Sequence, residues 1–141
     1  MHCGKLLHMR AGTKGGLQFH VKEEHHYLLS GKMRTWLDDG SGHLVEHGRV
    51  AGDAWRSDPG AVHQEEALTD VVVIEVSDQM FNDRIRVESQ YGLPDGGGLP
   101  SSTPMDAAAN LRRLAGALYQ RANECAAWAR RIEETGEIIP R

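Results

Sequence analysis

The pattern of the chain changes near residue 93, and this change constrains the fold more than any other feature. Between residues 5 and 91, short apolar or alternating runs are separated by Gly, Asp and Ser. Such spacing, with a strand about every 8–12 residues, is typical of an all-β domain. We expect strands at 5–9, 16–20, 25–29, 33–37, 43–47, 49–56 and 71–76. The last is rich in β-branched residues, so we expect it to be buried on both faces.

A helical pattern follows a linker-like segment. Residues 93–103 are rich in Gly, Pro and Ser, a composition that does not favour regular structure. Thr103-Pro104 then favours a helix start, and Gly136 can end one. The apolar residues recur at three, four and seven residues as Leu111, Leu114, Leu118, Cys125, Trp128 and Ile132. We therefore expect a β domain at 1–92, a linker at 93–103, and one or two helices at 104–136 that pack on the β domain or on a second subunit.

Two short segments place metal-ligand residue types at strand-like spacing. Gln18 and His20 are two residues apart on an expected strand, so their side chains point to the same face. A short turn separates them from Glu24, which can return to that face at the start of the next strand. A Pro-Gly turn then brings His63 back toward the same point. This pattern predicts a metal site formed by four side chains.

The first segment resembles the first motif of the cupin superfamily. That motif contains a His, any residue, a second His, three or four residues, a Glu, six residues and a Gly. Gln18, His20, Glu24 and Gly31 match this spacing, with Gln in place of the first His.

The second segment resembles the second cupin motif. It runs from Gly52 through Pro-Gly to His63, with Asp58 where Pro is usual and Ala67 where Asn is usual. The two motifs occur in the right order and separation, and the resemblance covers residues 5–91. It implies a mainly β, cupin (jelly-roll) barrel, here with a C-terminal α-helical extension.

The Gln of the first motif narrows this resemblance. Residues 17–20 and 24–31 are similar to the cupin domain of type II mannose-6-phosphate isomerases, in which Gln, His, Glu and a later His bind the metal. Residues 83–92 are similar to the end of that domain. One residue is missing from the turn before Glu24, and the C-terminal helix lies outside the pattern.

The ligand set indicates the kind of ion. Two imidazoles, one carboxylate and one amide oxygen, without a thiolate, suit one divalent transition metal ion such as Zn²⁺, Mn²⁺, Fe²⁺, Co²⁺ or Ni²⁺. With a single anionic ligand the site keeps a net positive charge. It therefore favours an anionic or polyhydroxy substrate.

Several further residues are candidates for catalysis or for substrate binding. His26 shares strand parity with Glu24, so we expect it in the cavity as an acid–base or contact residue. Either Glu65 or Glu66, which closely follow His63, can serve as a general base.

Three cations are candidate anion contacts. Lys22 lies in the turn before Glu24, where it either binds a phosphate or carboxylate or is simply solvated. Arg34 and Arg56 lie on expected strands and are alternatives to it.

Composition limits the partners. Lys and Arg number 16 against 20 Asp and Glu, a net charge of −4, which gives no reason to bind nucleic acid or anionic lipid. No apolar run is long enough for a signal peptide or a membrane span. We expect a cytoplasmic protein, a homodimer through the helix, with a small-molecule substrate.

Three functions are compatible with these residues. The first is a metal-dependent sugar or sugar-phosphate isomerase or epimerase, as the Gln-His-Glu-His set implies. The second is an Fe(II)-dependent dioxygenase, because two His and one carboxylate can hold iron with open positions. The third is a non-catalytic module that binds a small metabolite, since one fold hosts many functions.

Overall fold

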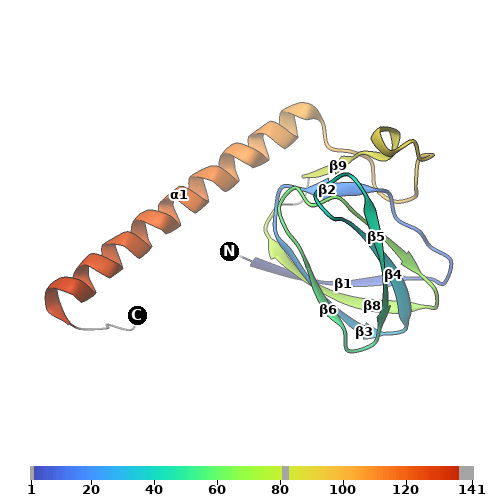
Figure 1. Ribbon diagram of the computed structural model, residues 1–141, viewed down its shortest axis with the longest axis horizontal. Helices are drawn as coiled ribbons and strands as arrows, with labels where there is room; N and C mark the ends of the chain where they lie inside the picture. Colours follow the sequence, from blue (N-terminus) through green and yellow to red (C-terminus); the bar gives the residue numbers. More distant parts are fainter. Residues whose placement is uncertain (1, 81–82, 137–141) are drawn as a thin grey trace.

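The strands form two antiparallel sheets that close into a jelly-roll barrel in the computed structural model (Figure 1). The structure describes residues 2–80 and 83–136. The first sheet has the strand order β1 (His2–Met9), β8 (Val71–Asp78), β3 (Glu24–Ser30) and β6 (Ala54–Ser57). The second has the order β5 (Leu44–Val50), β4 (Lys32–Asp38), β7 (His63–Ala67), β2 (Gln18–His20) and β9 (Arg84–Arg86).

Cross-strand register divides the barrel interior into an apolar end and a polar end. Leu28 of β3 pairs with Val73 of β8, and both are buried. Because every second side chain of a strand points inward, the next inward pair is His26 with Glu75, beside Lys5 of β1. The apolar end forms the core cluster of Leu28, Met33, Trp55, Ala67, Val71 and Val73. Burial of a Leu, Met or Val side chain contributes roughly 1.5–3 kcal/mol. The apolar end therefore stabilises the barrel, and the polar end is available for a site.

The chain crosses from the first sheet to the second between β3 and β4, so these two strands do not pair as a hairpin. The turn between them depends on a glycine. Gly31 has φ +90°, a left-handed conformation that side chains rarely adopt. A Cβ at this position would also lie 2.4 Å from the carbonyl oxygen of Asp70. In β4, which begins after this turn, Met33 lies opposite Ala67 of β7.

The strand at 71–76 differs from the prediction. It is central in its sheet, between β1 and β3, but only alternate residues are fully buried. Val71 and Val73 face the core, whereas Val76 is 43% exposed. One face of an antiparallel sheet can face water. β-branched residues favour a strand whether one face or both faces are buried, so the composition of 71–76 did not distinguish these two cases.

The segment at 93–103 has little regular structure, yet it is bonded to the barrel. Gly97 bridges Gly15, and the Ser102 backbone N–H donates to the carbonyl oxygen of Arg84 at 2.7 Å. A short 3₁₀ helix (Glu88–Tyr91) precedes the segment. The segment therefore forms part of the barrel wall rather than a free tether.

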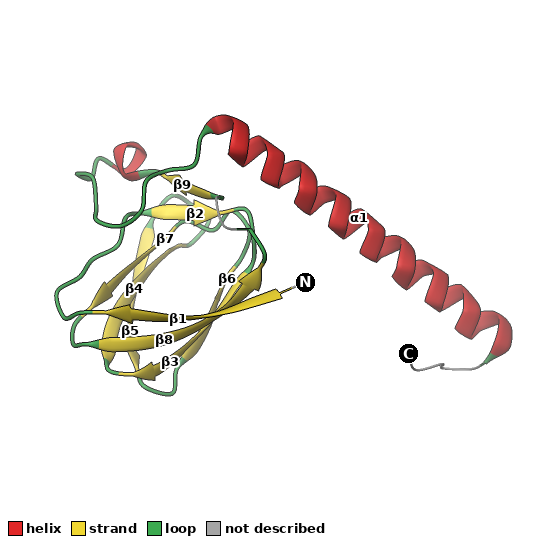
Figure 2. Cartoon of the chain, turned by 180° about the vertical axis from the view of Figure 1, so that it is seen from behind, coloured by secondary structure: helices red, strands yellow, loops and turns green. Residues whose placement is uncertain are grey.

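A single helix, α1 (Pro104–Thr135), ends the described chain. Thr103 caps it by accepting a hydrogen bond from the Asp106 backbone N–H at 3.1 Å, and Gly136 closes it in a left-handed conformation. Figures 1 and 2 show the helix extending away from the barrel, and Ala107 is its one buried residue. Within the described ranges, no helix is both long and apolar enough to cross a membrane.

Candidate metal centre

Three predicted ligands converge at the polar end of the barrel. Nitrogen and oxygen atoms of His20, Glu24 and His63 lie within 4.8 Å of one another. His20 Nε2 is 3.8 Å from Glu24 Oε1, and His63 Nε2 is 3.7 Å from Glu24 Oε2. All three residues are buried. A single ion at their centre can contact all three side chains.

Hydrogen bonds to the second ring nitrogens orient both imidazoles. His20 Nδ1 lies 3.2 Å from Asp83 Oδ1, and His63 Nδ1 lies 3.0 Å from the carbonyl oxygen of Ala61. Each Nδ1 can donate to its oxygen acceptor, which leaves Nε2 with a free lone pair toward Glu24. This is the arrangement that metal-ligating histidines require.

Gln18 lies beside these three ligands. Its amide nitrogen is 3.2 Å from His20 Nε2, and Gln18 pairs with His63 across β2 and β7. Rotating the amide by half a turn exchanges its nitrogen and oxygen. The amide oxygen can therefore face the position of an ion, and Gln18 remains our predicted fourth ligand.

The electrostatics of the site also suit a cation. Burial lowers the pKa of His63, although Glu24 opposes this effect, so His63 is neutral and able to bind a metal. The donor set of imidazole, carboxylate and amide fits the divalent transition metals expected from the sequence. Metal ligands must be unprotonated, and the environment of His63 satisfies this condition.

Lys22 is not a solvated side chain at the mouth of the barrel. It is 4% exposed, and its Nζ lies 3.2 Å from Glu24 Oε1 and 3.4 Å from Asp83 Oδ1. Burial disfavours the ammonium charge, but the two carboxylates raise the pKa of Lys22 overall. Lys22 therefore balances the charge of Glu24 and is committed to internal ion pairs.

The four predicted metal ligands line a cavity of about 610 Å³. Other polar residues in its wall are Lys5, His8, Lys22, His26, Glu65, Glu75 and Arg84. Residues 97–99, which begin at the Gly97 bridge, line part of the cavity. The cavity can hold a small molecule in contact with the ligands.

His26 faces the cavity, as its strand parity predicts. Its ring stacks on Trp55 at 4.9 Å between centroids, and Nε2 is 3.9 Å from Glu24 Oε2. Burial lowers the pKa of His26 to about 4, although Glu24 and Glu75 act in the opposite direction. The imidazole is therefore neutral near pH 7 and can both donate and accept a proton.

Glu65 and Glu66 lie on opposite faces of β7. Glu65 lines the cavity with His63, whereas Glu66 is absent from the described cavity wall. Glu65 Oε1 is buried and has no hydrogen-bond partner among the described residues. Burial, aided by Glu24 and Glu75, raises the pKa of Glu65 to about 7. Of the two candidate bases, Glu65 is the one placed to act.

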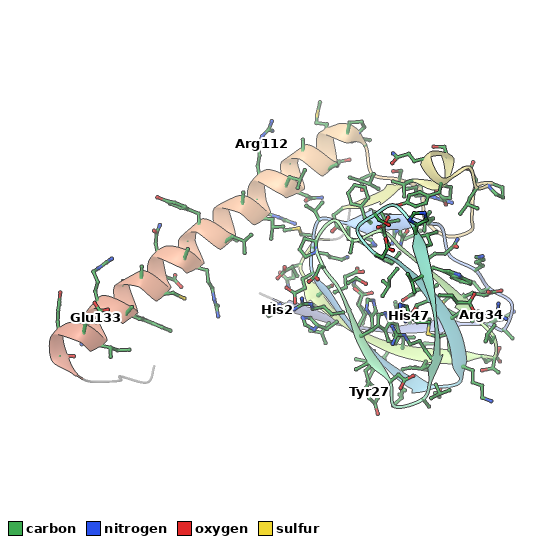
Figure 3. The ribbon with its side chains drawn as sticks, in the orientation of Figure 1. His2, Tyr27, Arg34, His47, Arg112 and Glu133 are labelled. Carbon is green, nitrogen blue, oxygen red and sulfur yellow. The ribbon has the colours of Figure 1, made fainter. Side chains whose placement is uncertain are left out.

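The other two predicted anion contacts lie on the outer surface. Arg34 lies at the outer edge of the barrel (Figure 3), where its Nε is 3.7 Å from Glu46 Oε1. Arg56 is paired with Asp58 at 2.8 Å. Neither lines the cavity, because strand alternation points both side chains to the solvent face. The structure therefore does not bring Arg34 and Arg56 together with the candidate metal ligands.

Sequence reasoning missed four residues of the site: Lys5, Glu75 and Arg84 line the cavity, and Asp83 contacts His20. Asp83, Lys5 and Arg84 carry no local signal, because distant parts of the fold bring them to the site. Glu75 did carry a signal, since it is the one charged residue within the apolar run 71–76. It is buried, and Lys5 Nζ donates to its Oε1 at 2.5 Å.

Comparisons with known proteins identify similar folds. No protein-family model matches the chain, and no curated protein matches its sequence. Oxalate decarboxylase from Bacillus subtilis aligns with a TM-score of 0.58 and 18% identity, over 72% of this chain and 34% of that one. The capsular polysaccharide assembling protein CapF from Staphylococcus aureus aligns with a TM-score of 0.53 and 22% identity, over 60% and 26%. An RmlC-like cupin from Shewanella frigidimarina gives 0.49 and 18%, over 54% and 64%.

The chain spans about a third of the length of the oxalate decarboxylase and about a quarter of CapF. At these identities the likeness concerns the fold alone. It agrees with the two-sheet barrel.

Proposed function

We propose that this chain, whose fold is that of the cupins, is a metal-dependent isomerase or epimerase acting on a small polyhydroxy substrate that carries an anionic group. The observation that carries the proposal is the position of Glu65. This carboxyl group lines the same cavity as His20, Glu24 and His63, and one of its oxygens is buried without a hydrogen-bond partner among the described residues. A general base works best when its pKa is near the operating pH, and the Glu65 pKa of about 7 meets that condition.

The residues divide the proton transfers between them. A divalent ion held by Gln18, His20, Glu24 and His63 would supply Lewis-acid polarisation of a substrate oxygen. Glu65 takes the proton from the carbon beside the substrate carbonyl. The electron pair of that C–H bond forms the C=C bond of an enediolate, and the carbonyl oxygen takes up the negative charge.

Return of the proton completes the reaction. Glu65 gives its proton to the neighbouring carbon in an isomerisation. An epimer forms instead when Glu65 keeps that proton and a second acid, on the opposite side of the substrate, protonates the original carbon. Aldose–ketose exchange also moves a proton between the two substrate oxygens. Neutral His26 can do this, because it donates from one ring nitrogen and accepts at the other.

Arg84 supports an anionic substrate. Three cations line the cavity. Lys5 is paired with Glu75, and Lys22 is paired with Glu24 and Asp83. The guanidinium of Arg84 has no carboxylate partner in the described part of the chain. An open guanidinium suits bidentate binding of a phosphate or carboxylate.

Deuterium exchange tests this function directly. Metal-loaded protein is incubated in D₂O with a panel of aldoses, ketoses and their phosphates, and carbon-bound deuterium is followed by NMR. We expect incorporation that Glu65→Gln reduces by about 10²–10⁴-fold, with metal affinity retained. Glu66→Gln is the matched control, because it removes a carboxylate from the outer face of the same strand. Absence of exchange with every compound would overturn the proposal.

The dioxygenase remains a second candidate because of the ligand trio itself. His20, Glu24 and His63 supply two imidazoles and one carboxylate, the set used by non-haem iron oxygenases. Oxygen consumption that requires Fe²⁺, without deuterium exchange, would favour it. A tightly retained small molecule with neither reaction would instead indicate a binding module.

A further inference from the structure

The apolar stripe of α1 is exposed along most of the helix. Leu111 is 53% exposed, Leu118 61%, Trp128 52% and Ile132 41%. Helices in proteins gain most of their stability from packing an apolar face, and a contiguous exposed apolar surface marks an interaction site. The barrel leaves these four side chains largely exposed, so the stripe offers an apolar surface to a partner.

The stripe follows a heptad repeat. Its first positions are Leu111, Leu118, Cys125 and Ile132, and the positions three residues later are Leu114, Arg121, Trp128 and Thr135. This 3.5-residue average spacing is typical of a helix that packs along a second helix in a coiled coil. The described part of the chain holds no second long helix.

We propose that α1 pairs with the α1 of a second copy of this chain as an antiparallel, two-fold coiled coil. The register we propose sets Leu114 opposite Ile132 of the partner subunit and Leu118 opposite Trp128 of the partner subunit. Two-fold symmetry repeats both contacts at the other end. Apolar side chains then meet at each end of the seam.

Charge complementarity selects the antiparallel orientation. Arg112 and Glu133, labelled near the two ends of α1 in Figure 3, each follow a first heptad position and lie outside the seam. Arg121 is itself a seam position. The proposed register places it opposite Cys125 of the partner subunit and close to Glu124 of the partner subunit. A parallel pair would instead place Arg121 beside its own copy, where the like charges repel.

A hollow between α1 and the barrel fits this arrangement. It has a volume of about 600 Å³ and is lined by Gln79 and Met80 on the barrel and by Leu114 and Leu118 on the helix. Arg113 spans one side of it by donating to the carbonyl oxygen of Gln79 at 3.0 Å. In the proposed register, the C-terminal half of the partner helix enters this hollow and covers both leucines. The contact therefore includes the barrel as well as the two helices.

Sedimentation of the full chain tests the association. We expect a dimer that Leu118→Glu weakens by roughly 100-fold or more, because a charge would be buried at the seam. Asn123→Glu is the matched control, because it adds the same charge on the opposite, exposed face of α1. A wild-type monomer at the highest soluble concentration, or equal weakening by both variants, would overturn the proposal.

Cysteine cross-linking tests the orientation. In a chain carrying Cys3→Ser and Cys125→Ser, one variant contains Leu118→Cys and another contains Trp128→Cys. Mixed under oxidising conditions, the two variants should form a disulfide-linked dimer, whereas neither should link to its own copy. Self-linking of each variant alone would indicate a parallel pair and overturn the proposal.

A charge swap tests the register. Arg121→Glu should raise the dimer dissociation constant by about three- to tenfold, since it places a like charge beside Glu124 of the partner subunit. Adding Glu124→Arg to that chain should restore wild-type affinity. Failure of the second substitution to restore dimerisation would overturn the register.

Discussion

Asp83 holds His20 in place, with Asp83 Oδ1 3.2 Å from His20 Nδ1. The same carboxylate accepts the backbone N–H groups of Val21 and Lys22 through Oδ2, at 3.2 and 3.1 Å. It therefore orients the imidazole and also fixes the turn that leads to Glu24. Burial alone would raise the pKa of Asp83, but the His20 hydrogen bond and the Lys22 charge lower it to about 2.

This relationship predicts that Asp83→Asn weakens metal binding. The amide keeps the size of the side chain but loses the charge that orients His20 and strengthens it as a ligand. Removing such a support typically costs 10–100-fold in metal affinity. Calorimetric titration with Zn²⁺ or Co²⁺ would measure it, with the exposed Asp58→Asn as control. Equal affinity of both variants and the wild type would show that Asp83 is not needed for binding.

The buried ion pairs of Lys22 lead to a second prediction, about how much a bound metal ion stabilises the protein. Lys22→Gln leaves Glu24 and Asp83 without their buried counter-charge, so the metal-free protein should lose about 3–5 kcal/mol. A divalent ion can replace the missing charge. The rise in melting temperature on adding Zn²⁺ should therefore be larger than in the wild type.

Thermal melts with and without Zn²⁺ check this prediction. Lys14→Gln is a suitable control, because Lys14 packs over Trp36, 4.3 Å from the ring centroid, outside the metal site. A metal-induced shift in Lys22→Gln that is no larger than in the wild type would contradict the charge balance described above.

The raised pKa of Glu65 predicts the pH dependence of the proposed reaction. The base must be deprotonated to accept a proton, so activity should rise as pH increases toward about 7. A bound cation favours the carboxylate, which moves this limb to lower pH. The dependence of kcat on pH would be measured for the wild type and for His26→Gln. An acid limb that remains without His26 is the one expected from Glu65. An acid limb that persists in Glu65→Gln would assign it to another group.

The convergence of the candidate metal ligands could be predicted because their spacing is local. Gln18 and His20 share a strand face, and a single turn returns the chain to Glu24. His63 required only the Pro-Gly turn at 59–60 and the cupin resemblance. Strand parity also placed His26 correctly in the cavity, since side chains alternate between the faces of a strand.

The rest depended on contacts between distant parts of the chain. Asp83 reaches His20 across 63 residues, and nothing in its neighbourhood marks it as a support for a ligand. Lys22 occupies a turn, where a solvated side chain is the usual outcome. Here two buried carboxylates compensate its burial. Composition correctly indicated little regular structure at 93–103, but it carried no information about the surface that this segment contacts.

The contact between residues 93–103 and the barrel predicts that one added methyl group lowers the stability of the protein. A Cβ on Gly96 would lie 2.8 Å from Gly16 Cα and 2.9 Å from the carbonyl oxygen of Gly15. Both atoms belong to backbone, so they cannot move aside as a flexible side chain can. Gly96→Ala should therefore cost about 1–3 kcal/mol of stability, as overpacking typically does.

The same substitution should also loosen the wall of the cavity. Gly96 is tied to the barrel by hydrogen bonds from its backbone N–H to Glu88 Oε1 at 3.2 Å and from Arg86 to its carbonyl oxygen at 2.6 Å. Displacing it moves residues 97–99, which line the cavity, so hydrogen exchange at 97–103 should accelerate. Gly48→Ala on β5 is the control, because nothing lies within 4 Å of a Cβ there. If both variants melt and exchange alike, the close approach of the two glycine segments does not hold the cavity wall.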